Sequence, residues 1–277
     1  MFLIGAVSTG QTATEGLFAR RPALAPGDAA TELALDTFRN PRYYDSRGEA
    51  NELARSLTLS MLELRASYGL SAAFGVGVLA TYRENRFCCA GGASLSDSGL
   101  SGIGAFLDWR PGAQAERSSA IRVGYEAQRR PNDSILPVAD GQDRVFVNSD
   151  WPLLQRTSGG LVLRVDGELG RKFEIQKSFF RGSARIASDI LIVRSSGLTL
   201  DAAATAGYLL ASDARENGTI FRNRRSTRGI AGVELRVGLG ARVRTGVFLG
   251  AERGFAYRNS LGGWRFGLTL RQLFGGS

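Results

Sequence analysis

Near its end the chain contains the segment Trp264-Arg-Phe-Gly-Leu-Thr-Leu-Arg-Gln-Leu-Phe274, in which apolar and polar residues alternate. One face of this segment carries Trp264, Phe266, Leu268, Leu270 and Phe274, and the other carries Arg265, Gly267, Thr269 and Arg271. Successive side chains of a β-strand point to opposite sides of the sheet. The spacing therefore predicts a strand with one apolar face and one polar face.

The same alternation recurs in strand-length segments from about residue 53 to residue 274. No segment has the pattern of a covering helix, and no apolar run approaches the roughly 18 residues that a membrane helix needs. Lipid is the simplest cover for so many apolar faces, and a sheet in lipid must close because free edges leave backbone groups unpaired. We predict an all-β fold, a closed antiparallel up-and-down transmembrane β-barrel. A soluble two-sheet sandwich is the alternative.

Counting a weak first strand over 30–38, the pattern predicts about 12 strands, an even number as in single-chain bacterial barrels. We expect three parts: an irregular leader over 1–28 that is a periplasmic tail or a plug, the barrel over 29–274, and a tail over 275–277. The apolar segment over residues 1–7 is too short, and lacks the basic start, for a complete secretory signal. The chain is then either a processed protein or the barrel portion of a longer one.

The predicted connections alternate in length. Short ones, such as 69–73 and 194–197, follow longer polar ones, such as 40–51 and 83–99. This order predicts short periplasmic turns and longer outer loops, with both ends of the barrel on the periplasmic side. Between Met61 and Leu62 the apolar face changes phase, which we interpret as a β-bulge.

The amino-acid composition excludes several classes of function. The net charge of +9 comes mostly from Arg residues spread one or two per strand, which favours a charged barrel lumen over a nucleic-acid-binding surface. The chain has no His, which excludes His-type zinc sites and Ser-His or Cys-His catalytic pairs. We therefore expect no enzymatic activity, no cofactor, no metal site and no nucleic-acid partner. The adjacent Cys88 and Cys89 are expected in an outer loop, where a bridge between them would be strained.

The alternating last segment ending in Phe274 resembles the terminal strand of Gram-negative outer-membrane β-barrels, and the resemblance covers about 30–274. It implies a location in the bacterial outer membrane, among lipid and lipopolysaccharide. It also implies recognition by the barrel assembly machinery through the strand that ends at Phe274. An oligomer or a larger export complex is compatible with the resemblance.

The polar faces predict a lumen lined by charge, and rings of Arg and Lys bias a pore toward anions. We thus predict a porin or passive transporter for anionic small solutes or acidic saccharides. The alternative is a lumen closed by Arg–carboxylate pairs, in a structural or interaction barrel such as the membrane domain of an exopolysaccharide-export or surface assembly. The candidate lumen residues are Arg65, Arg83, Arg122, Arg144, Arg164, Arg181, Arg185, Arg236, Arg242, Arg244, Arg265, Arg271, Glu126, Asp166, Glu168 and Glu234.

Aromatic residues fall near the strand ends, where their rings would sit at head-group depth in two girdles. Tyr68, Trp109 and Trp151 lie next to short turns, and Tyr82, Tyr125 and Trp264 lie nearer the longer loops. Packing at strand ends is the alternative explanation. The basic run over 222–228 predicts either contacts to lipopolysaccharide phosphates or solvated loop charge.

Overall fold

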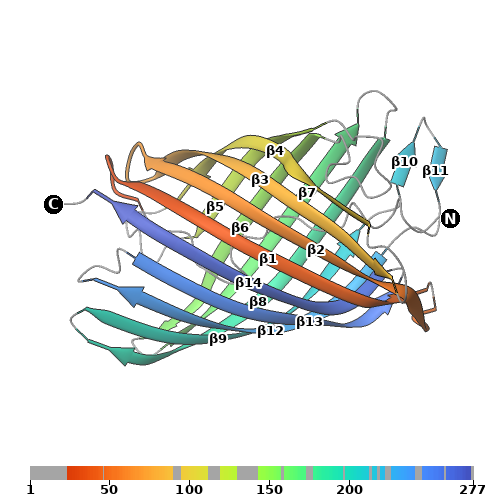
Figure 1. Cartoon of the computed structure of the whole chain (residues 1–277). Coiled ribbons are helices and arrows are strands. Elements are labelled where there is room, and N and C mark those ends of the chain that lie inside the picture. Colours follow the sequence, from red (N-terminus) through yellow and green to blue (C-terminus); the bar gives the residue numbers. More distant parts are fainter. Residues whose placement is uncertain are drawn as a thin grey trace.

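The computed structural model describes residues 24–45, 47–89, 95–111, 119–129, 143–156, 159–172, 177–195, 197–211, 214–216, 219–221, 226–240, 245–258 and 260–275 of the 277-residue chain. In this part the chain forms one antiparallel sheet that is rolled into a slanted barrel (Figure 1). No helix among the described residues is long and apolar enough to cross a membrane.

Twelve long strands build the barrel wall, and a small hairpin stands beside one end of it (Figure 1). The wall strands are β1 (Ala29–Tyr44), β2 (Ala50–Gly69), β3 (Phe74–Cys89), β4 (Leu95–Trp109), β5 (Ala120–Gln128), β6 (Asp143–Arg156), β7 (Gly159–Lys172), β8 (Lys177–Arg194), β9 (Leu198–Ala211), β12 (Ser226–Leu239), β13 (Thr245–Arg258) and β14 (Ser260–Phe274). The small hairpin consists of β10 (Ala214–Glu216) and β11 (Thr219–Phe221).

Each wall strand pairs with its neighbours in chain order, and β9 pairs with β12 past the small hairpin. The last strand then pairs with the first, from Ala29 opposite Phe274 to Tyr44 opposite Ser260. This pairing leaves no free edge in the wall, as a sheet in lipid requires. The predicted closed, up-and-down barrel of about 12 strands is confirmed. The hairpin of β10 and β11 was not predicted.

The alternation of the sequence becomes an inside and an outside. In β14, Phe266 and Leu270 are exposed at 53% and 44% of their surfaces, whereas Arg265 and Thr269 are buried at 4% and 1%. A soluble fold hides its large apolar side chains, but this barrel presents them all around its outer wall. The outward apolar belt is what a lipid bilayer covers.

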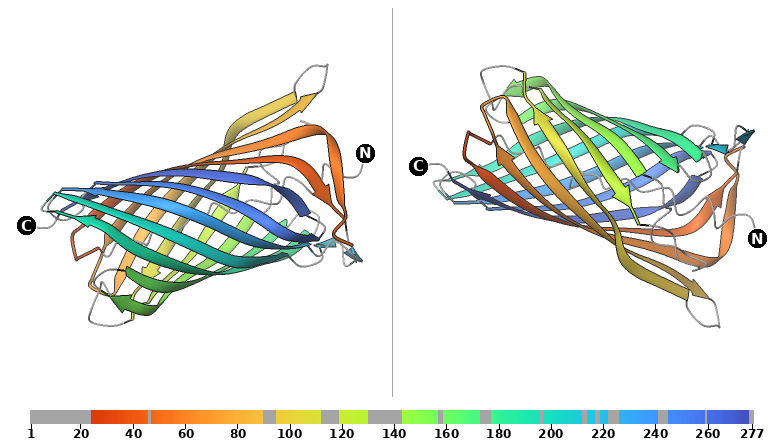
Figure 2. Two further views of the ribbon diagram at one scale, coloured as in Figure 1. Left: turned by 90° about the horizontal axis from the view of Figure 1, so that it is seen from below. Right: turned by 90° about the horizontal axis from the view of Figure 1, so that it is seen from above.

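The two ends of the barrel differ. We call the end where β1 begins and β14 finishes the terminal end, and the opposite end the loop end. At the loop end the hairpin of β1 and β2, orange in Figure 2, bends across toward β13. There the ring of Tyr44 stacks on that of Tyr257, with 4.3 Å between the centroids.

Two of the predicted outer loops are shorter than expected. The loop predicted over 40–51 is reduced because β1 runs to Tyr44 and β2 starts at Ala50. The loop predicted over 83–99 is reduced in the same way, since β3 runs to Cys89 and β4 starts at Leu95. The polar residues of these segments led us to predict loops. In the structure, strand pairing continues through them.

The β-bulge predicted between Met61 and Leu62 is wrong. The pairing of β1 with β2 is continuous from Tyr68 to Leu57. Instead, Leu57 and Met61 point into the barrel and are buried, while Leu62 points out and is exposed. The apparent phase change arises because this part of the interior is itself apolar, so both faces of β2 carry apolar residues.

In the sequence, a proline directly after an aromatic residue, as in Trp151-Pro152, predicts the end of the strand ladder. This prediction is wrong. Strand β6 continues to Arg156, and its pairing with β7 shifts between Pro152 and Leu154. A proline has no N–H for the ladder, so a bulge is where a strand can hold one.

Candidate functional site

The interior wall carries the charged residues that the sequence places on the polar faces. They are buried or half-buried and alternate along each strand with exposed apolar residues. The predicted lumen residues found there are Arg65, Arg83, Arg122, Arg144, Arg164, Arg185, Arg236, Arg265, Arg271, Glu126, Asp166 and Glu234. That they line an open passage stays a prediction.

The side chains of four other predicted lumen residues lie outside the part of the chain that the structure describes. Arg181 lies in β8 and Glu168 in β7, but their side chains belong to the part that the structure does not describe. Arg242 and Arg244 lie outside the described residues altogether, as do residues 1–23 of the predicted leader.

The seam between the first and last strands is held by buried ion pairs. Glu32 lies opposite Arg271 of β14 on one side and Arg65 of β2 on the other. Its Oε2 accepts from Nη2 of Arg271 at 2.6 Å, and its Oε1 accepts from Nη1 of Arg65 at 3.0 Å. Further along the same two strands, β1 and β14, Arg265 donates from Nε to Oδ2 of Asp36 at 2.6 Å. These side chains tie β14, β1 and β2 together.

Two bidentate pairs hold the opposite side of the wall. Arg122 donates to both carboxylate oxygens of Asp108 at 2.7 and 2.8 Å, and Arg164 donates to both of Asp150 at 2.6 and 3.2 Å. Each pair lies directly across two neighbouring strands. Bidentate Arg–carboxylate pairs combine charge with fixed geometry, so these residues brace the wall.

Two more interior acids also have partners. Asp166 accepts hydrogen bonds from Asn148 at 3.0 Å and from Ser183 at 3.1 Å, and Glu234 pairs with Arg236 at 2.7 Å. The described interior therefore holds a set of acids comparable to its set of Arg residues. The predicted excess of cations is not a property of the described interior as a whole.

One group of interior residues brings together Arg residues from three strands. Glu252 of β13 interacts electrostatically with Arg185 of β8, Arg228 of β12 and Arg265 of β14. The nearest nitrogen of Arg185 is 3.7 Å from Oε2 of Glu252, too far for a good hydrogen bond. Arg185 is only 2% exposed, and within the described part of the chain its Nε and Nη1 donate no hydrogen bond. We call Arg185, Arg228, Glu252 and Arg265 the arginine cluster.

Three interior residues at the seam and the cluster were missed among the predicted lumen residues. Glu32 and Asp36 alternate with Leu33 and Leu35, so the period-two pattern could have found them. Arg228 was assigned to a basic outer loop over 222–228, and that assignment is wrong. It lies in β12 with its guanidinium 5.6 Å from the ring centroid of Phe38, because strand β12 begins inside the basic run. Residues 222–225 lie outside the described part.

A small part of the interior toward the loop end, beside the arginine cluster, is apolar. Phe38, Leu57 and Leu59 form a buried cluster on β1 and β2, and Phe87 of β3 packs against it. Apolar constrictions in channels oppose the passage of water and ions. The interior therefore has a charged part, which includes the seam pairs, and a small apolar part toward the loop end.

The predicted girdle residues all point outward. Tyr68, Tyr82, Trp109, Tyr125, Trp151 and Trp264 are 40 to 48% exposed. Trp264 also stacks on Phe266, with 6.2 Å between ring centroids. This orientation agrees with contact at the lipid head groups, and the girdle function stays a prediction.

The two cysteines lie in a strand and not in the predicted outer loop. Cys88 and Cys89 are the last two residues of β3 and pair with Ser56 and Arg55 of β2. The strand continues past the expected loop start because β2 offers it a partner over this length. Their side chains are outside the described part.

No protein-family model matches the chain, and no curated protein matches its sequence. Solved structures are similar in fold. An outer membrane channel from Pseudomonas putida F1 superposes with a TM-score of 0.73 at 15% identity, over 95% of this chain and 100% of the other. The beta domain of the Bordetella autotransporter BrkA gives 0.59 at 16% identity, over 88% and 100%. The transport unit of the autotransporter AIDA-I from Escherichia coli gives 0.52 at 8% identity, over 99% of each chain.

At these identities the likeness concerns the fold. The resemblance to outer-membrane β-barrels seen in the sequence is confirmed, and it extends over nearly the whole chain. The closed wall and the outward apolar belt agree with it. The chain is a transmembrane β-barrel of the bacterial outer-membrane type.

Proposed function

We propose that the protein is a passive outer-membrane channel that favours small anionic solutes. The arginine cluster is the observation that carries this proposal. In it, three guanidinium groups interact electrostatically with the carboxylate of Glu252. Arg265 also interacts with Asp36 and Asp166, so that Glu252 is shared between Arg185 and Arg228. Guanidinium groups stay charged at all physiological pH values. A local surplus of fixed positive charge in a narrow interior attracts anions and repels cations.

The hydrogen-bonding state of Arg185 supports the same conclusion. A buried guanidinium is costly unless its N–H groups are satisfied. Two donor atoms of Arg185 find no acceptor among the described residues. An anion that enters the cluster would accept from these donors and offset the charge. The ion pairs elsewhere in the interior serve a different purpose, since their acids already neutralise their Arg partners.

The fold relatives support a transport role without specifying the solute. One of them is an outer membrane channel, and another is the transport unit of an autotransporter. The second candidate function is a non-conducting structural or interaction barrel. The bidentate pairs of Arg122 with Asp108 and of Arg164 with Asp150 favour it, because they occupy interior space and rigidify the wall.

Single-channel recording in planar bilayers tests the proposal. With a KCl gradient, the reversal potential of the protein should indicate that chloride is more permeant than potassium. The Arg185→Gln variant should lower this preference, since it removes a buried charge whose ion pair with Glu252 is long, at 3.7 Å. The Arg194→Gln variant is the matched control, because Arg194 is exposed at the terminal end of β8. A folded barrel that never conducts would favour the non-conducting alternative.

A further inference from the structure

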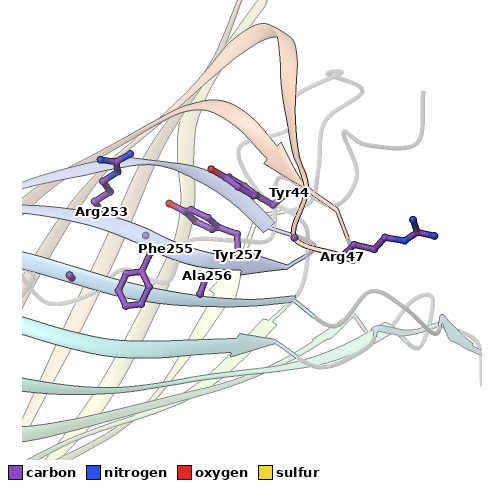
Figure 3. A pocket seen from close by; sticks show the side chains of 9 residues that line it. Tyr44, Arg47, Arg253, Phe255, Ala256 and Tyr257 are labelled. Atoms are coloured by element: carbon purple, nitrogen blue, oxygen red, sulfur yellow. The ribbon is translucent and has the colours of Figure 1, made fainter.

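A pocket of about 690 Å³ lies at the loop end, where the hairpin of β1 and β2 bends over β13 (Figure 3). Tyr44, Arg47 and Gly48 of the hairpin line one side, and residues 253–257 of β13 line the other. We call it the mouth pocket. Its volume is within the range of pockets that bind small molecules. It is separate from the arginine cluster, whose residues do not line it.

Two tyrosines form the floor of the mouth pocket. Tyr44 and Tyr257 stack with an angle of 20° between their rings, and Tyr257 is almost fully buried. Room for the rings comes from glycines, because a Cβ at Gly254 would overlap Tyr257 and a Cβ at Gly262 would overlap Tyr44. The flat, rigid rings thus present a fixed aromatic surface.

The backbone at the mouth pocket is distorted. Ala256 has φ of 49°, the one positive φ at a non-glycine residue in the described part of the chain. The pairing of β12 with β13 also shifts between Thr227 and Gly229, beside Phe255. Strained residues and bulges persist where the surrounding structure holds them, and they gather at ligand sites and at barrel rims.

Two exposed guanidinium groups flank the aromatic floor. Figure 3 shows the two tyrosine rings between Arg47 at the hairpin tip and Arg253 on β13. No Asp or Glu lines the pocket, and in the described part neither Arg has an ion pair. The carboxylate of Asp45, close by in the hairpin, accepts hydrogen bonds from the backbone N–H groups of Arg47 and Glu49. It also interacts electrostatically with Arg47. The mouth pocket therefore has a guanidinium group at each end and no carboxylate in its lining.

We propose that the mouth pocket binds an anionic saccharide of about two sugar units. One sugar face would lie against the stacked tyrosine pair, on the side of the half-buried Tyr44, since aromatic rings combine a large apolar face with a polar edge. One acidic group would pair with Arg47 and a second with Arg253. Such a saccharide can be a free solute or the phosphorylated head group of a glycolipid. A glycolipid can reach the site because the guanidinium of Arg253 lies 5.3 Å from the ring centroid of Trp264, which points outward. The inference does not depend on whether the interior conducts.

Tryptophan fluorescence provides the test. In the full chain with Trp109 and Trp151 changed to Phe, Trp264 is the only tryptophan and lies beside Arg253. Titration with digalacturonate, a free disaccharide with two carboxylates, should change its fluorescence in a saturable manner. Cellobiose, which is neutral, should not. A second arm embeds the protein in nanodiscs with or without a diphosphorylated glucosamine disaccharide lipid, which identifies a glycolipid source.

The variants Arg47→Gln and Arg253→Gln should each weaken binding by about 10-fold, the effect of losing one charge-assisted contact. Arg86→Gln is the control, because Arg86 is also exposed near the loop end but pairs with Glu84. Folding of each variant is checked by heat-modifiable migration on gels. A response to either anionic saccharide that depends on Arg47 and Arg253 supports the proposal. Equal binding of cellobiose, equal binding of inorganic phosphate, or no dependence on the two Arg residues in both arms overturns it.

Discussion

Arg271 in the last strand donates a hydrogen bond from Nη2 to Oε2 of Glu32 in the first strand at 2.6 Å. The two residues lie directly opposite each other at the seam where the barrel closes. Both side chains are about nine-tenths buried. A buried ion pair thus connects the first and last strands where the barrel closes, in addition to the backbone hydrogen bonds between them.

The seam pair predicts how the barrel responds to loss of one partner. Arg271→Ala should lower the free energy of unfolding by about 3 kcal/mol, because it leaves the buried Glu32 carboxylate with fewer partners. Urea unfolding in detergent micelles, followed by loss of heat-modifiable migration, measures the change. Arg86→Ala, which breaks the exposed pair with Glu84, should cost less than about 1 kcal/mol. Equal losses in the two variants would contradict a special role of the seam.

A second prediction concerns glycines that make room for aromatic rings inside the barrel. A Cβ at Gly124 of β5 would overlap the ring of Phe146 of β6. Gly124→Ala should therefore destabilise the barrel by about 1–3 kcal/mol through overpacking. The same unfolding assay applies, and a Phe146→Leu change made together with Gly124→Ala should recover part of the loss.

Gly197 provides the control for this prediction. A Cβ at this turn position would meet no atom within 4 Å. Gly197→Ala should leave stability unchanged or slightly higher, since alanine reduces the freedom of the unfolded chain. If both glycine variants behave alike, crowding at Phe146 is not the reason for glycine at 124.

The third prediction is a pH effect at the hairpin of β1 and β2. The backbone N–H of Glu49, together with those of Arg47 and Gly48, lowers the pKa of Asp45 below its ordinary value of 3.8. Because the folded pKa is the lower one, the carboxylate contributes loop stability that is fully present above pH 3.8. That contribution is lost as the pH falls through the folded pKa.

Carbon-13 NMR of the Asp45 carboxyl group measures this titration in the refolded barrel. We expect a midpoint below 3.8, accompanied by a shift of the Glu49 amide signal over the same pH range. Asp45→Asn should abolish the pH dependence of the Glu49 signal. A midpoint at or above 3.8 would show that the backbone hydrogen bonds do not hold in solution.

Alternation alone was sufficient to predict which side of the wall most residues face. As predicted, Phe266 points outward and Arg265 points inward, and all six predicted girdle residues point outward. The pattern misled where both faces of a strand are apolar. At Leu57 and Met61 the sequence shows apolar residues on the wrong phase, and only the structure reveals that they enter an apolar part of the interior.

The same limit explains the errors at Pro152, at the cysteines and at Arg228. Proline, polar residues and a basic run are typical of loops, but a strand can continue through them when a neighbouring strand supplies the ladder. Pairing with a neighbour is a property of two segments, and a pattern within one segment does not contain it.

The alternation of apolar and polar residues was enough to predict a closed barrel with an apolar outside and a charged inside, because side-chain direction in a strand alternates locally with a period of two. Which charges meet depends on how the strands are arranged in three dimensions. Arg185, Arg228 and Glu252 come from β8, β12 and β13, and Tyr44 reaches Tyr257 only because the first hairpin bends across the mouth. Such encounters follow from strand register and barrel curvature, which depend on the pairing of all the strands at once.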